Sequence, residues 1–219
     1  MNSLIFEDLL CSVLFFLVSC GYNKKDLPSD TSSTPVSTNE DFKDTKKRKN
    51  IKYFSNYKFL MRKANTQIRI TNYQNALFYL KKAKTNLSKT DDYYVPEKFK
   101  DRELFLLNSK LLKCYVEMYK SNLMQYTQQS LEETVKICED QTDPVSRKKC
   151  FEVLQKILSV SENRAYHSNV KTYLALEEKL LHKYPAFALR YKTVTKEIKK
   201  SQEFLETLDK ITHYKGGQL

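Results

Sequence analysis

The distribution of glycine constrains the fold of this chain more than any other feature of its sequence. The chain has 219 residues and three glycines, Gly21, Gly216 and Gly217, so residues 22–215 contain none. A β-rich fold of that length needs several residues with positive φ at hairpin turns and bulges, and glycine is their usual supplier. Leu, Lys, Glu and Gln, which favour helices, are abundant. The sequence therefore predicts an all-α fold built from antiparallel helical hairpins.

Capping residues and prolines predict where the helices start. The start signals are Thr71 with Gln74, Ser130 with Glu133, Asp143 with Pro144, Ser168, and Pro185. With apolar periodicity they predict helices over about residues 51–69, 72–87, 98–126, 131–139, 144–161, 168–183 and 185–212. The last helix carries a seam for packing on a neighbouring or partner helix. The seam consists of Val194, Ile198, Ser201, Leu205, Leu208 and Thr212.

An apolar run at residues 9–18 has the length of the hydrophobic part of a signal peptide, and is too short to cross a bilayer core of roughly 30 Å. It ends in Leu17-Val18-Ser19-Cys20, which resembles the lipobox of bacterial lipoproteins. The resemblance implies a signal peptide over residues 1–19 and acyl chains such as palmitate on Cys20, which anchor the chain to a membrane. Gly21, in place of Asp, implies by the same resemblance an outer-membrane location in the cell envelope.

Residues 1–8 depart from the lipoprotein pattern, because they include Glu7 and Asp8 and no basic residue. Two alternatives therefore stay open. The first is a cleaved secretory signal that carries no lipid. The second is an ordinary hydrophobic helix of a soluble protein, in which Cys20 is incidental.

Residues 20–50 are rich in Ser, Thr, Asp, Asn and Lys and contain few large apolar groups. Such a stretch buries too little surface to offset its ordering entropy, which predicts a disordered tether after the lipidated cysteine. Its basic end, residues 46–49, is either a solvated charge run or a contact for anionic head groups. We expect the helical domain over residues 51–213 and a disordered tail over residues 214–219.

The predicted hairpin over residues 51–87 resembles one tetratricopeptide repeat. Ala64, Ala76, Leu80 and Ala83 match its small and large positions. The small residues allow two antiparallel helices to cross closely. Ser88 replaces the usual Pro, and the repeat has no second good copy along the chain. The sequence therefore leaves two architectures open, a tetratricopeptide-like array and an irregular helical bundle.

The cysteines predict one cross-link. Cys138 and Cys150 flank the turn between two predicted helices, where they form a candidate disulfide in an exported protein, although free thiols stay an alternative. Cys114 lies on an apolar stripe and is predicted to be a core residue. No spacing of His, Cys or acids matches a metal site, so we expect no metal and no cofactor.

We expect no enzyme and no small-molecule substrate, because the chain lacks a glycine-rich phosphate loop and a nucleophile elbow. Glu177 and Glu178 are adjacent acids that we interpret as an exposed helix face rather than a catalytic pair. Aromatic and basic residues interleave instead, in a chain with net charge +12. They predict a partner surface that consists of Tyr53, Tyr57, Arg62, Arg69, Tyr73, Tyr79 and Lys82.

The features together indicate a lipid-anchored helical adaptor that binds an envelope protein or peptide. It resembles the tetratricopeptide-bearing lipoproteins of the outer-membrane β-barrel assembly machinery, and that resemblance implies a role in outer-membrane assembly. A surface-displayed lipoprotein that binds host or environmental ligands is one alternative. An unlipidated basic protein that binds nucleic acid is another, although nucleic acid is not the partner we expect for an exported chain.

Overall fold

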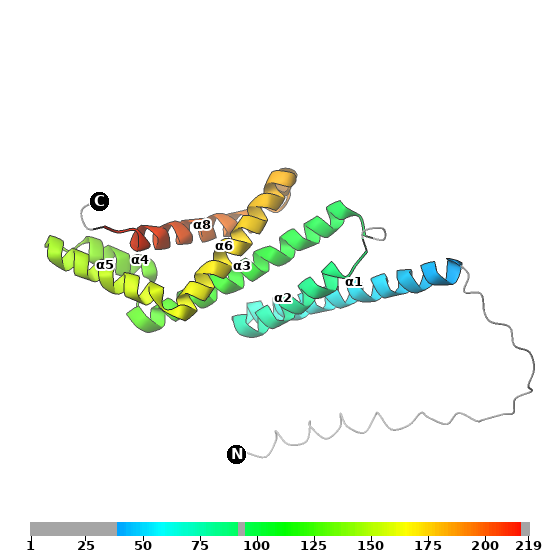
Figure 1. Cartoon of the computed structure of the whole chain (residues 1–219), viewed down its shortest axis with the longest axis horizontal. Coiled ribbons are helices and arrows are strands. Elements are labelled where there is room, and N and C mark those ends of the chain that lie inside the picture. The colour runs from blue at the N-terminus through cyan, green and yellow to red at the C-terminus, as the bar shows by residue number, and fades with distance from the viewer. Residues whose placement is uncertain (1–38, 92–94, 216–219) are drawn as a thin grey trace, which may run out of the picture. The chain divides into compact units, whose positions relative to one another are not determined.

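The computed structural model describes residues 39–91 and 95–215, and these contain eight helices and no strand (Figure 1). The all-α prediction is confirmed. The helices are α1 (Asn39–Arg69), α2 (Tyr73–Ser88), α3 (Glu97–Thr127), α4 (Leu131–Glu139), α5 (Pro144–Ser159), α6 (Ser161–Lys183), α7 (Ala186–Arg190) and α8 (Lys192–Thr212). None of these helices combines the length and apolar character that crossing a membrane requires. The predicted signal segment and Cys20 lie outside the described residues.

Helix α1 starts at Asn39 rather than near Ile51, so residues 39–50, which the sequence assigned to the tether, are helical. The end of this segment contacts the folded domain. Asn50 is buried, and its side-chain oxygen accepts a hydrogen bond from the backbone N–H of Asp91. Lys46 Nζ lies 2.9 Å from the carboxylate of the same aspartate. These contacts join the added part of the helix to the loop after α2.

Helices α1 and α2 form an antiparallel hairpin. Ala64 on α1 and Ala76 and Ala83 on α2 are fully buried, as is Leu80. Small side chains at these positions allow the two backbones to approach, and the leucine fills the space between them.

The turn between α1 and α2 differs from its prediction. Thr71 has a φ of 57°, and its N–H donates to the carbonyl of Ile68, while the N–H of Asn72 donates to Gln67. This pattern is a Schellman motif, with threonine at the left-handed position that glycine usually occupies. The side chain of Asn72, one residue later than predicted, accepts a hydrogen bond from Asn75 N–H and caps α2. The proposed Thr71–Gln74 capping box is therefore wrong.

Of the other predicted helix starts, two are confirmed and the one at Ser168 is wrong. The capping box of Ser130 and Glu133 is present at α4, and Asp143 caps α5 with Pro144 in its first turn. Helix α6, however, starts at Ser161 rather than at Ser168. The chain changes direction at one residue, Val160, whose ψ of 139° interrupts two nearly continuous helices. Sequence periodicity does not resolve so short an interruption.

Helix α3 lies at the centre of the core and packs against α2, α6 and α8 (Figure 1). In the predicted α8 seam, Ile198, Ser201, Leu205 and Leu208 are buried, whereas Val194 is half-buried and Thr212 is exposed. The predicted disordered tail also needs a correction at its first residue. Tyr214 is half-buried, and its ring stacks on Phe151 at 4.1 Å between centroids.

Candidate protein-binding groove

Cys138 and Cys150 form a disulfide that joins the end of α4 to α5, with 5.4 Å between the Cα atoms. The sequence had placed them as a candidate pair. Cys114, the free cysteine among the described residues, is buried in α3 as predicted. Burial raises the pKa of its thiol to about 12, so the thiol stays protonated and is a poor nucleophile.

The residues predicted as a partner surface do not gather in one place. Tyr57 is fully buried and cannot contact a partner, which corrects that part of the prediction. Of the rest, Tyr53, Tyr73 and Tyr79 are half-buried, and Arg62, Arg69 and Lys82 are exposed. Arg62 borders a hollow of about 520 Å³ between α1 and α3, whereas Tyr73 lines a different hollow next to α6.

Tyr57 instead anchors α1 to α3 through Glu103. Its hydroxyl donates to Glu103 Oε2 at 2.8 Å, and Lys58 Nζ donates to the same oxygen at 2.7 Å. Arg102 donates to the other carboxylate oxygen at 2.7 Å. Burial alone would raise the pKa of Glu103, but the hydrogen bonds from Lys58, Arg102 and Tyr57 outweigh it and lower the pKa. Tyr57 and Lys58 of α1 are thereby joined to α3 through one carboxylate.

Glu177 corrects another expectation. It was interpreted as part of an exposed acidic face, yet its side chain is fully buried on α6. The reason is its spacing: Val170, Tyr173, Leu174 and Glu177 are all buried and lie at intervals of three and four residues along one face of the helix. Neither carboxyl oxygen has a hydrogen-bond partner, and burial raises the pKa to about 9.

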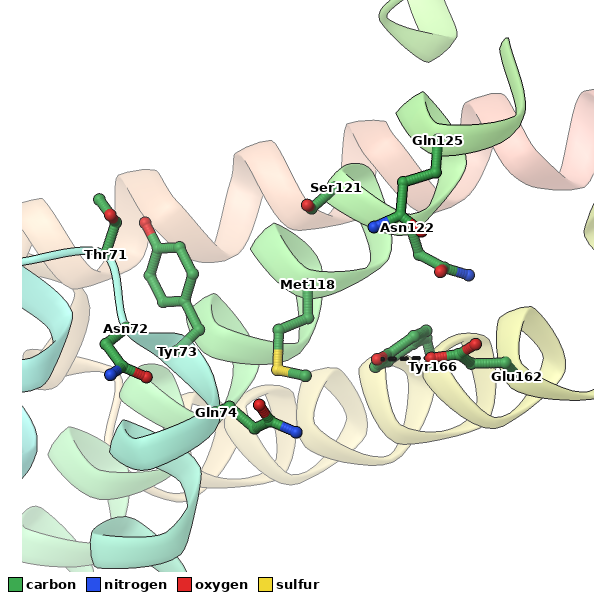
Figure 2. A pocket seen from close by; sticks show the side chains of 10 residues that line it. All are labelled: Thr71, Asn72, Tyr73, Gln74, Met118, Ser121, Asn122, Gln125, Glu162 and Tyr166. Atoms are coloured by element: carbon green, nitrogen blue, oxygen red, sulfur yellow. Dashed lines mark hydrogen bonds between the residues drawn. The ribbon is translucent and has the colours of Figure 1, made fainter. Parts of the chain in front are cut away.

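The candidate binding site is the second of these hollows, a groove of about 450 Å³ (Figure 2). Its lining comes from three parts of the chain, namely the start of α2, the C-terminal half of α3 and the first turns of α6. The lining residues are Thr71, Asn72, Tyr73, Gln74, Met118, Ser121, Asn122, Gln125, Glu162 and Tyr166. We call this the α2–α3–α6 groove.

The chemistry of the α2–α3–α6 groove suits a polypeptide. Asn72, Gln74 and Gln125 carry amides that both donate and accept hydrogen bonds, as a peptide backbone requires. Met118 offers an adaptable apolar contact between the two sides of the groove, as Figure 2 shows. Tyr166 lies across from it with its hydroxyl donating to Glu162 at 3.2 Å.

Buried hydrogen bonds hold the wall of the groove that α3 and α6 form. Asn122 Nδ2 donates to Asn163 Oδ1 at 2.6 Å, and Asn163 Nδ2 donates to the carbonyl of Ile157 at 2.8 Å. Both asparagines are buried. These bonds tie α3 to the α5–α6 junction, so the wall formed by α3 and α6 is pre-organised for a ligand.

Two tyrosines supply hydroxyl groups at the groove. Burial raises the pKa of Tyr73, and burial with the Glu162 hydrogen bond raises that of Tyr166, so both hydroxyls stay neutral donors. Within the part of the chain that the structure describes, no group of His, Cys, Asp and Glu could hold a metal ion.

Of the predicted surface residues only Tyr73 lines the α2–α3–α6 groove. Ser121, Gln125 and Glu162 were missed, because they are ordinary polar helix residues that become neighbours only when helices distant in sequence pack together. Searches against protein families, curated proteins and solved structures find no match to this chain.

Proposed function

We propose that this chain is a lipid-anchored helical adaptor of the cell envelope, which binds a segment of another protein in the α2–α3–α6 groove. The observation that carries the proposal is the groove lining, which combines side-chain amides with Met118, Tyr73 and Tyr166. Amides match the donors and acceptors of a peptide backbone, and the apolar groups receive side chains of the bound segment.

Two features support placement in the envelope. The Leu17-Val18-Ser19-Cys20 motif is the proposed lipidation site. The Cys138–Cys150 disulfide is of the kind that persists in oxidising compartments outside the cytosol. The buried alanines of the α1–α2 hairpin support a tetratricopeptide-like arrangement, in which stacked helical hairpins form a peptide-binding groove. A role in outer-membrane assembly is the process that we propose on this basis.

Site-specific photo-crosslinking in intact cells tests the groove. A photoreactive amino acid replaces Gln125, which is exposed at the groove, or Glu203, which is exposed on α8. We expect a discrete crosslinked protein from position 125 and none from position 203. Equal crosslinking at both positions, or none at either, would overturn the proposal.

A matched pair of substitutions adds specificity. Ser121→Arg places a bulky charge in the groove, and Ser168→Arg places the same charge at an exposed α6 position outside it. Only Ser121→Arg should abolish the crosslink from position 125. The anchor is tested separately, because labelled fatty acid should enter the unaltered chain but not Cys20→Ala.

A further inference from the structure

The positive charge of this protein is concentrated in the α1–α2 hairpin. Residues 43–89 contain fourteen Lys and Arg and a single acid, Asp44. Residues 90–219 contain twenty-two Lys and Arg but nineteen Asp and Glu, so they are nearly neutral. Like charges three and four residues apart destabilise a helix, so this density on α1 favours an anionic partner.

One side of α1 carries exposed cations and exposed apolar groups together. It consists of Lys49, Lys52, Phe59 and Lys63 with Ile70, which directly follows α1, and we call it the basic outer face of α1. Phe59 and Ile70 are 52% and 62% exposed. Lys49, Lys52 and Lys63 form no ion pair with any described residue. The buried side of α1, with Met61 and Ala64, packs on α2 instead.

We propose that the basic outer face of α1 lies on an anionic lipid surface. Lysine ammonium groups reach phosphate head groups while their methylene stems cover apolar surface. Isoleucine and phenylalanine side chains between them enter the boundary between head groups and acyl chains. This inference deepens the proposed function, because stable attachment of an acylated protein benefits from a second membrane signal such as a basic patch.

The same observations favour lipid over single-stranded nucleic acid. Nucleic-acid platforms stack bases on flat aromatic rings. The only ring on the basic outer face of α1 is that of Phe59, and Lys63 Nζ lies over it at 5.6 Å from the centroid. Ile70 has no π-face to offer a base, but it partitions into a lipid interface.

Vesicle binding tests the proposal with the full chain carrying Cys20→Ala, so that no acyl chain contributes. We expect it to co-sediment with vesicles of phosphatidylcholine mixed with phosphatidylglycerol, less so as salt increases, and not with phosphatidylcholine alone. Each basic side chain near an anionic surface contributes about fivefold to binding, so K49E/K52E/K63E, which reverses three charges, should weaken it at least about a hundredfold. The matched variant K196E/K199E/K200E reverses the same number of charges at exposed positions on α8. It should change vesicle binding less than about threefold.

A second pair of variants tests the apolar contact. Phe59→Gln should weaken vesicle binding severalfold, whereas Leu189→Gln, at an exposed position on α7, should leave it unchanged. All these positions are exposed, so far-ultraviolet circular dichroism should show equal helix content.

Three results would overturn the lipid proposal. They are equal binding to neutral vesicles, equal losses from the two triple variants, and tighter binding to a single-stranded oligonucleotide that K49E/K52E/K63E abolishes. The last would identify nucleic acid as the ligand of this face. None of these results affects crosslinking from position 125, so failure here is distinguishable from failure of the proposed groove.

Discussion

Glu103 on α3 and Glu177 on α6 are both buried in one helical core, with exposed fractions of 3% and 0%. Their surroundings differ. Glu103 accepts hydrogen bonds from Tyr57, Lys58 and Arg102, which lie on α1 and α3. Glu177 has no partner at either oxygen. Burial raises the pKa of Glu177 to about 9, whereas the three donors lower that of Glu103.

The difference teaches that burial does not by itself decide whether a carboxyl group is charged. A buried carboxylate is stable where donors replace its lost water, and it takes up a proton where they do not. The α1–α3 contact therefore depends on an ionised acid, and α6 accommodates a neutral one. Substitution of Glu103 should consequently destabilise the folded chain, and substitution of Glu177 should stabilise it.

Removing the hydrogen-bonded carboxylate of Glu103 should have the largest effect on stability. Glu103→Leu removes the carboxylate that accepts from Tyr57, Lys58 and Arg102, so we expect the free energy of unfolding to fall by about 4 kcal/mol. Urea denaturation measures the change. Glu152→Leu, at an exposed position on α5, is the control and should change stability by less than about 0.5 kcal/mol. A loss at Glu103 no larger than that of the control would remove the distinction between the two acids.

Substitution of Glu177 is expected to change the free energy of unfolding in the opposite direction. Glu177→Met replaces an unpartnered carboxyl by an apolar side chain of similar size, so the free energy of unfolding at pH 7.5 should rise by about 3 kcal/mol. The same urea titration measures it. Glu178→Met, one residue away and exposed, controls for a general effect on α6. Destabilisation by Glu177→Met would show that the carboxyl has a partner in solution.

The pH dependence sharpens the comparison. The folded chain holds a proton on Glu177 up to about pH 9, whereas the unfolded chain releases it near the ordinary value of 4.5. Unfolding between these values releases a proton, so stability falls as the pH rises, by up to about 1.4 kcal/mol per pH unit. The gain from Glu177→Met should therefore shrink between pH 7.5 and pH 5. A gain that is independent of pH would show that the carboxyl is ionised in the folded chain.

Glu103 makes stability depend on pH in the direction opposite to Glu177. Because its folded pKa is lowered, its contribution to stability is present above the ordinary carboxyl pKa and is lost as the pH falls through the folded value. Glu103→Leu should therefore cost less in acid than at neutral pH. This profile is opposite in sign to that of Glu177→Met, so the two variants separate the two acids in one set of titrations.

In two places local signals in the sequence predicted the helix start correctly. Ser130 with Glu133 and Asp143 with Pro144 are such cases, because a cap depends on neighbours in the chain. At Thr71 the local signal failed, because the preceding helix ends in a Schellman motif that takes this residue into the left-handed region. A helix end and the next helix start compete for the same few residues there.

Contacts between distant helices were beyond the reach of these local signals. Tyr57 was predicted for a partner surface, since an aromatic residue among lysines suits exposed and buried positions alike, and its true partner lies 46 residues away at Glu103. The α2–α3–α6 groove depends on the same kind of long-range packing. Glu177 is different, because its spacing from Val170 and Leu174 already placed it on the buried face of its helix.

The smallest expected effect separates the contribution of the Tyr57 hydroxyl from those of Lys58 and Arg102. Tyr57→Phe removes one of three donors and leaves Lys58 and Arg102 in place, so unfolding should become easier by about 1 kcal/mol. Tyr119→Phe is the control, because Tyr119 is equally buried and its hydroxyl makes no hydrogen bond to a described residue; it should change stability by less than about 0.5 kcal/mol. Thermal unfolding of both variants at pH 7.5 compares them. If the two are indistinguishable, the contrast between Glu103 and Glu177 depends on the cations alone, and the neutral hydroxyl contributes only packing.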